Sequence, residues 1–157
     1  MRFGLIALMV WVWAGVANAC PDFQLWGNER YDLTAQQLYS PQGFRVVAGG
    51  NNNLAACRIK ARNFRGAMPG YVTTAPDFSM TVRGRSGFQL EFRVVSNCDA
   101  TLLINTASGN WYFDDDDNGN ADPKIRLTRP AADGIYDVWI GTFDGSSCDA
   151  VLYMETF

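Results

Sequence analysis

Histidine is absent from the 157 residues of this chain. Its absence excludes catalysis by a Ser-His-Asp triad or a Cys-His pair, histidine general bases and histidine-ligated zinc. The Gly-x-Ser-x-Gly motif of many hydrolases is missing as well. We therefore expect a protein without enzymatic activity.

Charged residues are also few, at 18% of the chain, and the formal net charge is −3. This mild acidity argues against nucleic acid as the main partner, because binding to phosphates depends on clustered Lys and Arg. No apolar run after residue 19 is long enough for a transmembrane segment. The expected protein is a monomer whose partner is an unidentified protein or a surface glycan.

Residues 1–19 have the features of a secretory signal peptide. Arg2 supplies a basic start, residues 5–14 form an apolar core, and Ala17-Asn18-Ala19 is a small-residue cleavage site. Cys20 follows directly, but Ala17 stands where a lipobox would favour leucine, so soluble export is preferred over a lipoprotein. The sequence predicts an exported protein of the periplasm or the extracellular medium.

The chain has four cysteines, all after the predicted cleavage site: Cys20, Cys57, Cys98 and Cys148. An even number in an exported protein indicates two disulfides. Cys98-Asp99-Ala100 recurs as Cys148-Asp149-Ala150, and each copy begins a predicted strand. Matched strand starts can bring two thiols within bridging range. We predict Cys98–Cys148 and, by elimination, Cys20–Cys57.

Alternation of apolar and polar residues predicts an all-β fold. Phe78, Met80 and Val82 share one face of a strand, and residues 88–94 alternate in the same way. The Gly-containing link at 84–87 predicts that these two strands form a β-hairpin. Further strands are expected at 44–48, 57–62, 99–105, 110–114, 124–128, 134–143 and 149–156, and one helix at 33–39. Short strands with frequent turns indicate an antiparallel β-sandwich that is jelly-roll-like.

An acidic run is the main candidate for a metal site. Its predicted ligands are the side chains of Asp114, Asp116, Asn118 and Asp122 and the backbone carbonyl of Asn120. This spacing resembles the beginning of an EF-hand loop, and calcium takes about six to eight oxygen ligands. Ile125 replaces the closing glutamate, so water or the neighbouring Asp99 and Asp144 must complete the shell. The alternative is a solvated acidic turn.

The second half of the chain carries an ordered series of short motifs. They are Asp77-Phe78-Ser79-Met80, Phe88-Gln89-Leu90-Glu91-Phe92, the segment 99–104, Ser108-Gly109-Asn110-Trp111, the acidic run and the segment 134–140. In this order they make residues 76–157 resemble the bacterial pre-peptidase C-terminal domain. The resemblance implies a small β-sandwich that accompanies secreted proteases, binds calcium in several members and is not itself catalytic.

Residues 20–75 form an N-terminal β segment that is too short for a protease domain. Pro21-Asp22-Phe23 recurs as Pro76-Asp77-Phe78, and Phe44-Arg45-Val46-Val47 recurs as Phe92-Arg93-Val94-Val95. These echoes are interpreted either as a decayed repeat packed on the main sandwich or as chance similarity between strands.

Aromatic residues offer an alternative function. Trp26 and Trp111 are candidates for a platform on which sugar rings stack, together with Tyr112 and Trp139. Core packing is the other interpretation, above all for Trp139, because large aromatic residues are usually buried.

Two charged groups complete the candidates. Arg58, Lys60 and Arg62 would share one strand face, where they either bind a polyanion or are simply solvated. A carboxylate pair for hydrolysis would come from Glu91, Asp99, Asp137 and Glu155. The favoured function is a non-catalytic, calcium-binding exported module for a protein or cell-surface component. Carbohydrate binding and a small secreted hydrolase or peptidase-associated protein are the alternatives.

Overall fold

The computed structural model of the protein describes residues 19–128 and 133–157. Residues 1–18, and with them nearly all of the predicted signal peptide, lie outside the described residues. Within the described ranges, no helix is long and apolar enough to cross a membrane.

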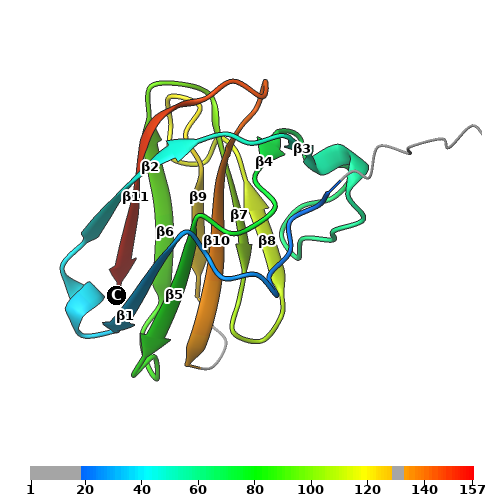
Figure 1. Ribbon diagram of the computed structural model, residues 1–157. Coiled ribbons are helices and arrows are strands. Elements are labelled where there is room, and N and C mark those ends of the chain that lie inside the picture. Colours follow the sequence, from blue (N-terminus) through cyan, green and yellow to red (C-terminus); the bar gives the residue numbers. More distant parts are fainter. Residues whose placement is uncertain (1–18, 129–132) are drawn as a thin grey trace, which may run out of the picture.

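Two β-sheets pack face to face and confirm the predicted all-β sandwich (Figure 1). Sheet A contains β1 (Glu29–Thr34), β3 (Asn52–Asn53), β4 (Tyr71–Val72), β5 (Phe78–Arg83), β7 (Ala100–Asn105), β8 (Trp111–Asp114) and β10 (Gly134–Thr142). Sheet B contains β2 (Gln42–Ala48), β6 (Leu90–Ser96), β9 (Lys124–Leu127) and β11 (Cys148–Thr156). Two short 3-10 helices, η1 (Gln37–Tyr39) and η2 (Leu54–Ala56), lie in the connections.

Strand pairing is antiparallel except between β1 and β5, which run parallel. Sheet B has the order β2-β11-β6-β9. In sheet A, β10 is central and pairs with β5, β4 and β7, while β8 extends the sheet beyond β7. Along the chain the strands switch repeatedly between the sheets, so neither half of the sequence builds a sheet alone.

The main core lies between the sheets and is formed by the alternate residues that the sequence pattern identified. Phe78, Met80 and Val82 of β5 are at most 1% exposed, and Phe92 and Val94 of β6 are fully buried. Apolar burial at about 25 cal/mol per Å² is the dominant favourable term in folding. The alternation in the sequence therefore predicted the buried face of each strand correctly.

The predicted hairpin is wrong, because β5 lies in sheet A and β6 in sheet B. Both strands bury their apolar faces in the core between them, so the link must cross from one sheet to the other. Gly84 and Gly87, with φ values of +70° and +86°, provide the sharp turns. The Asp133 carboxylate holds the link by accepting the backbone N–H groups of Gly84 and Arg85 at 2.8 and 2.9 Å.

Two further local predictions fail. Residues 57–62 contain only an isolated bridge from Ala61 to Trp111, because Ile59 and Ala61 instead pack on the outer face of sheet A. The helix expected at 33–39 shrinks to η1, since its first two residues pair with β5 as part of β1.

The outer face of sheet A is covered by a second apolar cluster. Its buried members are Leu54 and Met68 from the covering segment and Val72, Leu103, Phe113 and Trp139 from the sheet. The covering segment, residues 54–70, connects β3 to β4 and therefore forms a third layer on this side (Figure 1).

Both predicted disulfides are present. Cys98 and Cys148, with Cα atoms 6.3 Å apart, join the start of β7 in sheet A to the start of β11 in sheet B. Cys20 and Cys57, 5.8 Å apart, tie the N-terminal loop to the segment that covers sheet A. Two disulfides are typical of proteins in an oxidising environment outside the cytoplasm.

Candidate functional site

The loop at 21–28 is fixed on the outer side of sheet A by its own backbone. Cys20 is disulfide-bonded at its beginning, and the N–H of Asp22 donates to the carbonyl of Thr74 at 2.9 Å. The Asp22 carboxylate accepts the N–H of Gln24 at 2.9 Å, which forms a tight turn of the Asx type. The loop is thus held in one conformation before any ligand binds.

The end of this loop lies so close to β5 that only glycine fits there. A Cβ atom on Gly27 would be 2.5 Å from the backbone nitrogen of Ser79. The N–H of Gly27 donates to Ser79 Oγ at 2.8 Å, and this hydroxyl donates to Asp137 Oδ1 at 2.6 Å. These two consecutive hydrogen bonds orient the Asp137 carboxylate beneath the loop.

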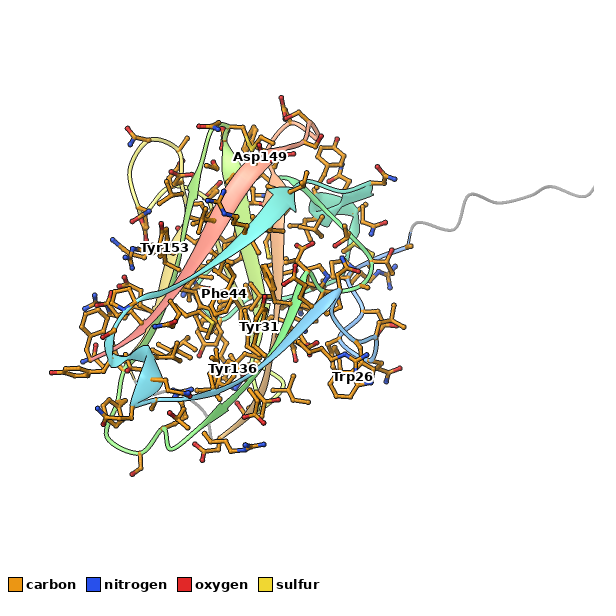
Figure 2. The ribbon with its side chains drawn as sticks, turned by 60° about the vertical axis from the view of Figure 1, so that its left-hand side comes forward. Trp26, Tyr31, Phe44, Tyr136, Asp149 and Tyr153 are labelled. Carbon is orange, nitrogen blue, oxygen red and sulfur yellow. A yellow bond between two sulfur atoms is a disulfide. The ribbon has the colours of Figure 1, made fainter. Side chains whose placement is uncertain are left out.

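Four large apolar side chains near this carboxylate face solvent, and we call them the Trp26 surface. They are Trp26 at 56% exposed, Phe23 at 48%, Leu25 at 44% and Ile135 of β10 at 37%. Together with Gln24 and Asp137 they line a cavity of about 170 Å³. Figure 2 shows Trp26 away from the interior aromatic residues of the sandwich. Clustered apolar residues of this kind mark binding sites more often than scattered ones do.

The two tryptophans predicted as ligand-binding residues have different environments. Trp26 carries the Arg30 guanidinium 4.7 Å from its ring centre and is otherwise open to solvent. Trp111 is half-buried, with its ring 5.3 Å from Trp139 and 5.9 Å from Phe23. Trp139 is fully buried, as the core interpretation expected. Trp111 therefore supports Phe23 from below.

The cavity contains one ionisable group. Burial raises the pKa of Asp137, and the hydrogen bond from Ser79 opposes this rise less strongly. A carboxylate at the wall of a small apolar cavity is a strong acceptor for hydroxyl or amide hydrogens.

In the acidic loop, three predicted calcium ligands are engaged in other hydrogen bonds. Asp114 Oδ2 accepts the backbone N–H groups of Asp117 and Lys124 at 3.0 and 2.8 Å. The side-chain amide of Asn118 donates to the carbonyl of Val94 at 2.8 Å. The third ligand, Asp122, accepts the hydroxyl of Ser96 at 2.7 Å. Asp116 and Asn120 are exposed on the same loop.

The remaining acids of this region repel one another. Burial raises the pKa of Asp99, and the charges of Asp116 and Asp144 raise it further. The pKa of Asp115 is raised by burial first and then by Asp116 and its other acidic neighbours. Among residues 19–128 and 133–157, no group of three or more acids or cysteines is placed to hold a metal ion. Calcium binding by this loop stays a prediction.

The carboxylates considered for hydrolysis are Glu91, Asp99, Asp137 and Glu155, of which only Glu91 and Glu155 lie side by side. Glu91 and Glu155 are cross-strand neighbours on the outer face of sheet B. Arg126 pairs with Glu91 at 2.7 Å and Arg93 pairs with Glu155 at 3.3 Å. Asp137 lies on the opposite sheet and Asp99 in the loop before β7.

The basic residues keep their predicted alternation without forming a strand. Arg58, Lys60 and Arg62 are exposed, whereas Ile59 and Ala61 are half-buried between them. The guanidinium of Arg62 is held by the side-chain oxygen of Asn110 at 2.7 Å.

Sequence reasoning missed four residues that shape the surface and its surroundings: Phe23, Leu25, Ile135 and Asp77. Three large apolar residues within positions 23–26, with no strand alternation, were the available signal for an exposed loop. Asp77 lies in a predicted strand motif, yet burial raises the pKa of Asp77 to about 7 even though the N–H of Ile140 stabilises its charge.

Comparison with known proteins gives no relative, since no family model, curated protein or solved structure matches the chain. The resemblance to the pre-peptidase C-terminal domain therefore remains an expectation from the motifs alone.

Proposed function

We propose that this chain is an exported, non-catalytic β-sandwich module that binds a glycan of a cell surface through the Trp26 surface. The observation that carries the proposal is a loop, fixed by a disulfide and by backbone hydrogen bonds, that exposes Phe23, Leu25 and Trp26 around a cavity with a carboxylate wall. A site that is ordered in advance avoids the entropy cost of ordering on binding.

The chemistry of the cavity suits a sugar. Sugar rings have an apolar C–H face that packs on aromatic rings and hydroxyl groups that donate to carboxylates and amides. Phe23 and Trp26 supply the rings, and Asp137 and Gln24 supply the polar groups. The cavity volume of about 170 Å³ is below the range of about 300–1,000 Å³ that accommodates drug-sized ligands. It accommodates one ring, such as the end of a chain.

The composition of the same cavity supports a non-catalytic role. Glycoside hydrolysis uses two carboxylates, one on each side of the bond that is cleaved. Asp137 is the one carboxylate that lines the cavity. Export is supported by the two disulfides and by the signal-like residues 1–19.

Glycan-array binding followed by calorimetry on the oxidised protein tests the proposal. We expect Trp26→Ala and Phe23→Ala each to weaken glycan binding at least about tenfold, which corresponds to about 1.4 kcal/mol. Tyr39→Ala is the matched control, because Tyr39 is an aromatic residue 63% exposed on η1, away from the loop.

Unchanged glycan affinity in Trp26→Ala would contradict the proposal. If no glycan binds, but purified surface proteins bind wild type and fail to bind Trp26→Ala, the ligand is a protein and the glycan assignment is wrong.

A further inference from the structure

The two edge strands of sheet B differ in their protection against pairing with another chain. β9 has four residues, follows Pro123 and carries Lys124 and Arg126. Short length, proline and charges are the usual protection of an exposed edge. β2 has seven residues, of which Arg45 is the one charged residue, and its Val47 is 63% exposed. β2 is therefore the less protected edge.

Open space lies on both sides of β2. Of the described strands, only β11 pairs with β2. A cavity of about 670 Å³ on the outer face of sheet B and one of about 240 Å³ towards β1 and β5 share Glu29 and the stretch Arg45, Val46 and Val47. In Figure 2 the strand lies in front, with Asp149 near its end. The two cavities leave the edge of β2 open along Arg45, Val46 and Val47.

Two exposed charges beside this edge have no partner of opposite sign. Arg45 is paired across the sheet with Val151, and Val47 with Asp149, so Arg45 and Asp149 lie on the same face. Neither forms an ion pair with any residue of the described chain. The β2 edge thus offers a cation and an anion, separated along the strand direction, that form no ion pair within the described chain.

We infer that a second copy of this chain binds here, with the two β2 strands antiparallel and the twofold axis at Val46. An edge strand is completed by strand addition, and a twofold interface must be complementary to itself. In this register Arg45 lies opposite Val47 of the copy. Its side chain covers that valine and extends towards Asp149 of the copy, one strand further on at about 4.8 Å spacing. The contact occurs twice.

Neighbouring registers are less favourable. An axis at Arg45 places the two guanidinium groups opposite each other, and like charges directly opposite are destabilising. An axis at Val47 places Arg45 opposite Gly49 of the copy and moves it away from Asp149. The charges thus select the Val46 register, and the result is a continuous sheet of two four-stranded halves. The inference is independent of glycan binding and departs from the monomer expected from sequence.

Light scattering coupled to size-exclusion chromatography of the oxidised protein tests the inference. We expect wild type to have twice the mass of one chain, and Arg45→Glu and Asp149→Arg each to halve the measured mass. The double variant Arg45→Glu/Asp149→Arg should regain the dimer, because it restores the ion pair with exchanged signs. Lys124→Glu on β9 is the matched control and should remain dimeric.

Each alternative outcome overturns a defined part of the inference. A wild-type monomer at every soluble concentration, or a dimer insensitive to both single variants, rejects the β2 interface. Single variants that dissociate and a double variant that stays monomeric reject the Val46 register. Circular dichroism and melting temperatures that match wild type establish that the variants are folded.

Discussion

The outer face of sheet A is buried under a third layer, whereas the outer face of sheet B is open. On sheet A, residues 54–70 cover Leu103, Phe113 and Trp139. On sheet B, the corresponding positions carry ion pairs such as Arg126 with Glu91 at 2.7 Å, and the Tyr153 ring lies beneath the guanidinium of Arg93 at 4.9 Å. No segment of the described chain forms a comparable apolar layer there.

The strands of the two sheets differ in their burial patterns. All six residues of β7 are buried, as are the last seven of β10, so these strands have apolar contacts on both faces. In β11, buried and half-buried residues alternate along most of the strand. Continuous apolar runs are typical of strands covered on both sides, and alternation is typical of strands with one solvated face. The pattern therefore reports how many layers lie around a strand.

The largest expected effect compares one aromatic residue from each face. Trp139→Ala should destabilise the protein by about 3–5 kcal/mol, because a fully buried ring leaves a cavity and unsatisfied contacts. Tyr153→Ala should cost about 1 kcal/mol or less, since the ring is half-exposed. Urea unfolding of both variants measures the difference. Equal losses of stability would contradict the conclusion that the outer face of sheet A is buried and that of sheet B is open.

The second prediction concerns Asp77, which lies at the side of the sandwich, between the edges of the two sheets. Asp77 is 6% exposed and lines the cavity of about 240 Å³ between β5 and β2. Its pKa is raised from 3.8 to about 7 in the folded state, mainly by burial. Between these values the folded chain binds more protons than the unfolded chain. Wild-type stability should therefore fall as the pH rises from about 4 to about 7, and level off above.

Asp77→Asn isolates this contribution, because its side chain keeps an oxygen acceptor for the N–H of Ile140 without a charge. Each pKa unit corresponds to about 1.4 kcal/mol, so the stability difference between wild type and variant should change by about 4 kcal/mol from pH 4 to pH 8. Thermal melts across this range provide the measurement. Parallel pH profiles for the two proteins would refute the assignment.

The smallest expected effect belongs to the acidic loop, which lies outside both faces. Calcium should relieve the repulsion among Asp99, Asp115 and Asp116, but the internal hydrogen bonds of the loop place affinity in the weak range of about 10⁻⁴–10⁻³ M. At about a hundredfold excess over the dissociation constant, the gain is at most about 2.7 kcal/mol. Wild type should melt higher with calcium than with a chelator.

Asp116→Ala should abolish the calcium-dependent difference, whereas Asp32→Ala, which removes an exposed acid of β1, should retain it. Identical wild-type melts with calcium and with chelator would identify the acidic run as a solvated turn.

Local patterns determined which parts of the fold could be predicted. The alternation in 78–83 and 88–94 identified the buried faces of β5 and β6, and the repeated Cys-Asp-Ala motif gave the Cys98–Cys148 pair. Pairing partners were not predictable, because a strand with one apolar face can bury it from either sheet. β1 escaped prediction because Tyr31 and Leu33 are its two apolar residues.

The candidate site was predictable only in part for a similar reason. Trp26 was identified from residue type, and it is exposed. Ile135 and Asp137 join it from more than a hundred residues away, through the packing of Gly27 against β5 and the pairing of β5 with β10. No local pattern encodes such a contact. In the acidic run, by contrast, a local pattern was present but did not determine the role of its residues. Side chains with the spacing of calcium ligands form hydrogen bonds within the loop and to β6.

The two disulfides also define how the chain carries mechanical tension. A pull transmitted along the backbone passes through the Cys20–Cys57 bridge, which bypasses β1, β2 and β3, and then through the Cys98–Cys148 bridge, which bypasses β7 to β10. Among the residues that the structure describes after Cys20, only those at 57–98 and 148–157 can lengthen under load while both bridges are intact. The loop that displays Trp26 lies within the first bypassed segment. Stretching the chain therefore leaves that loop without tension along its backbone.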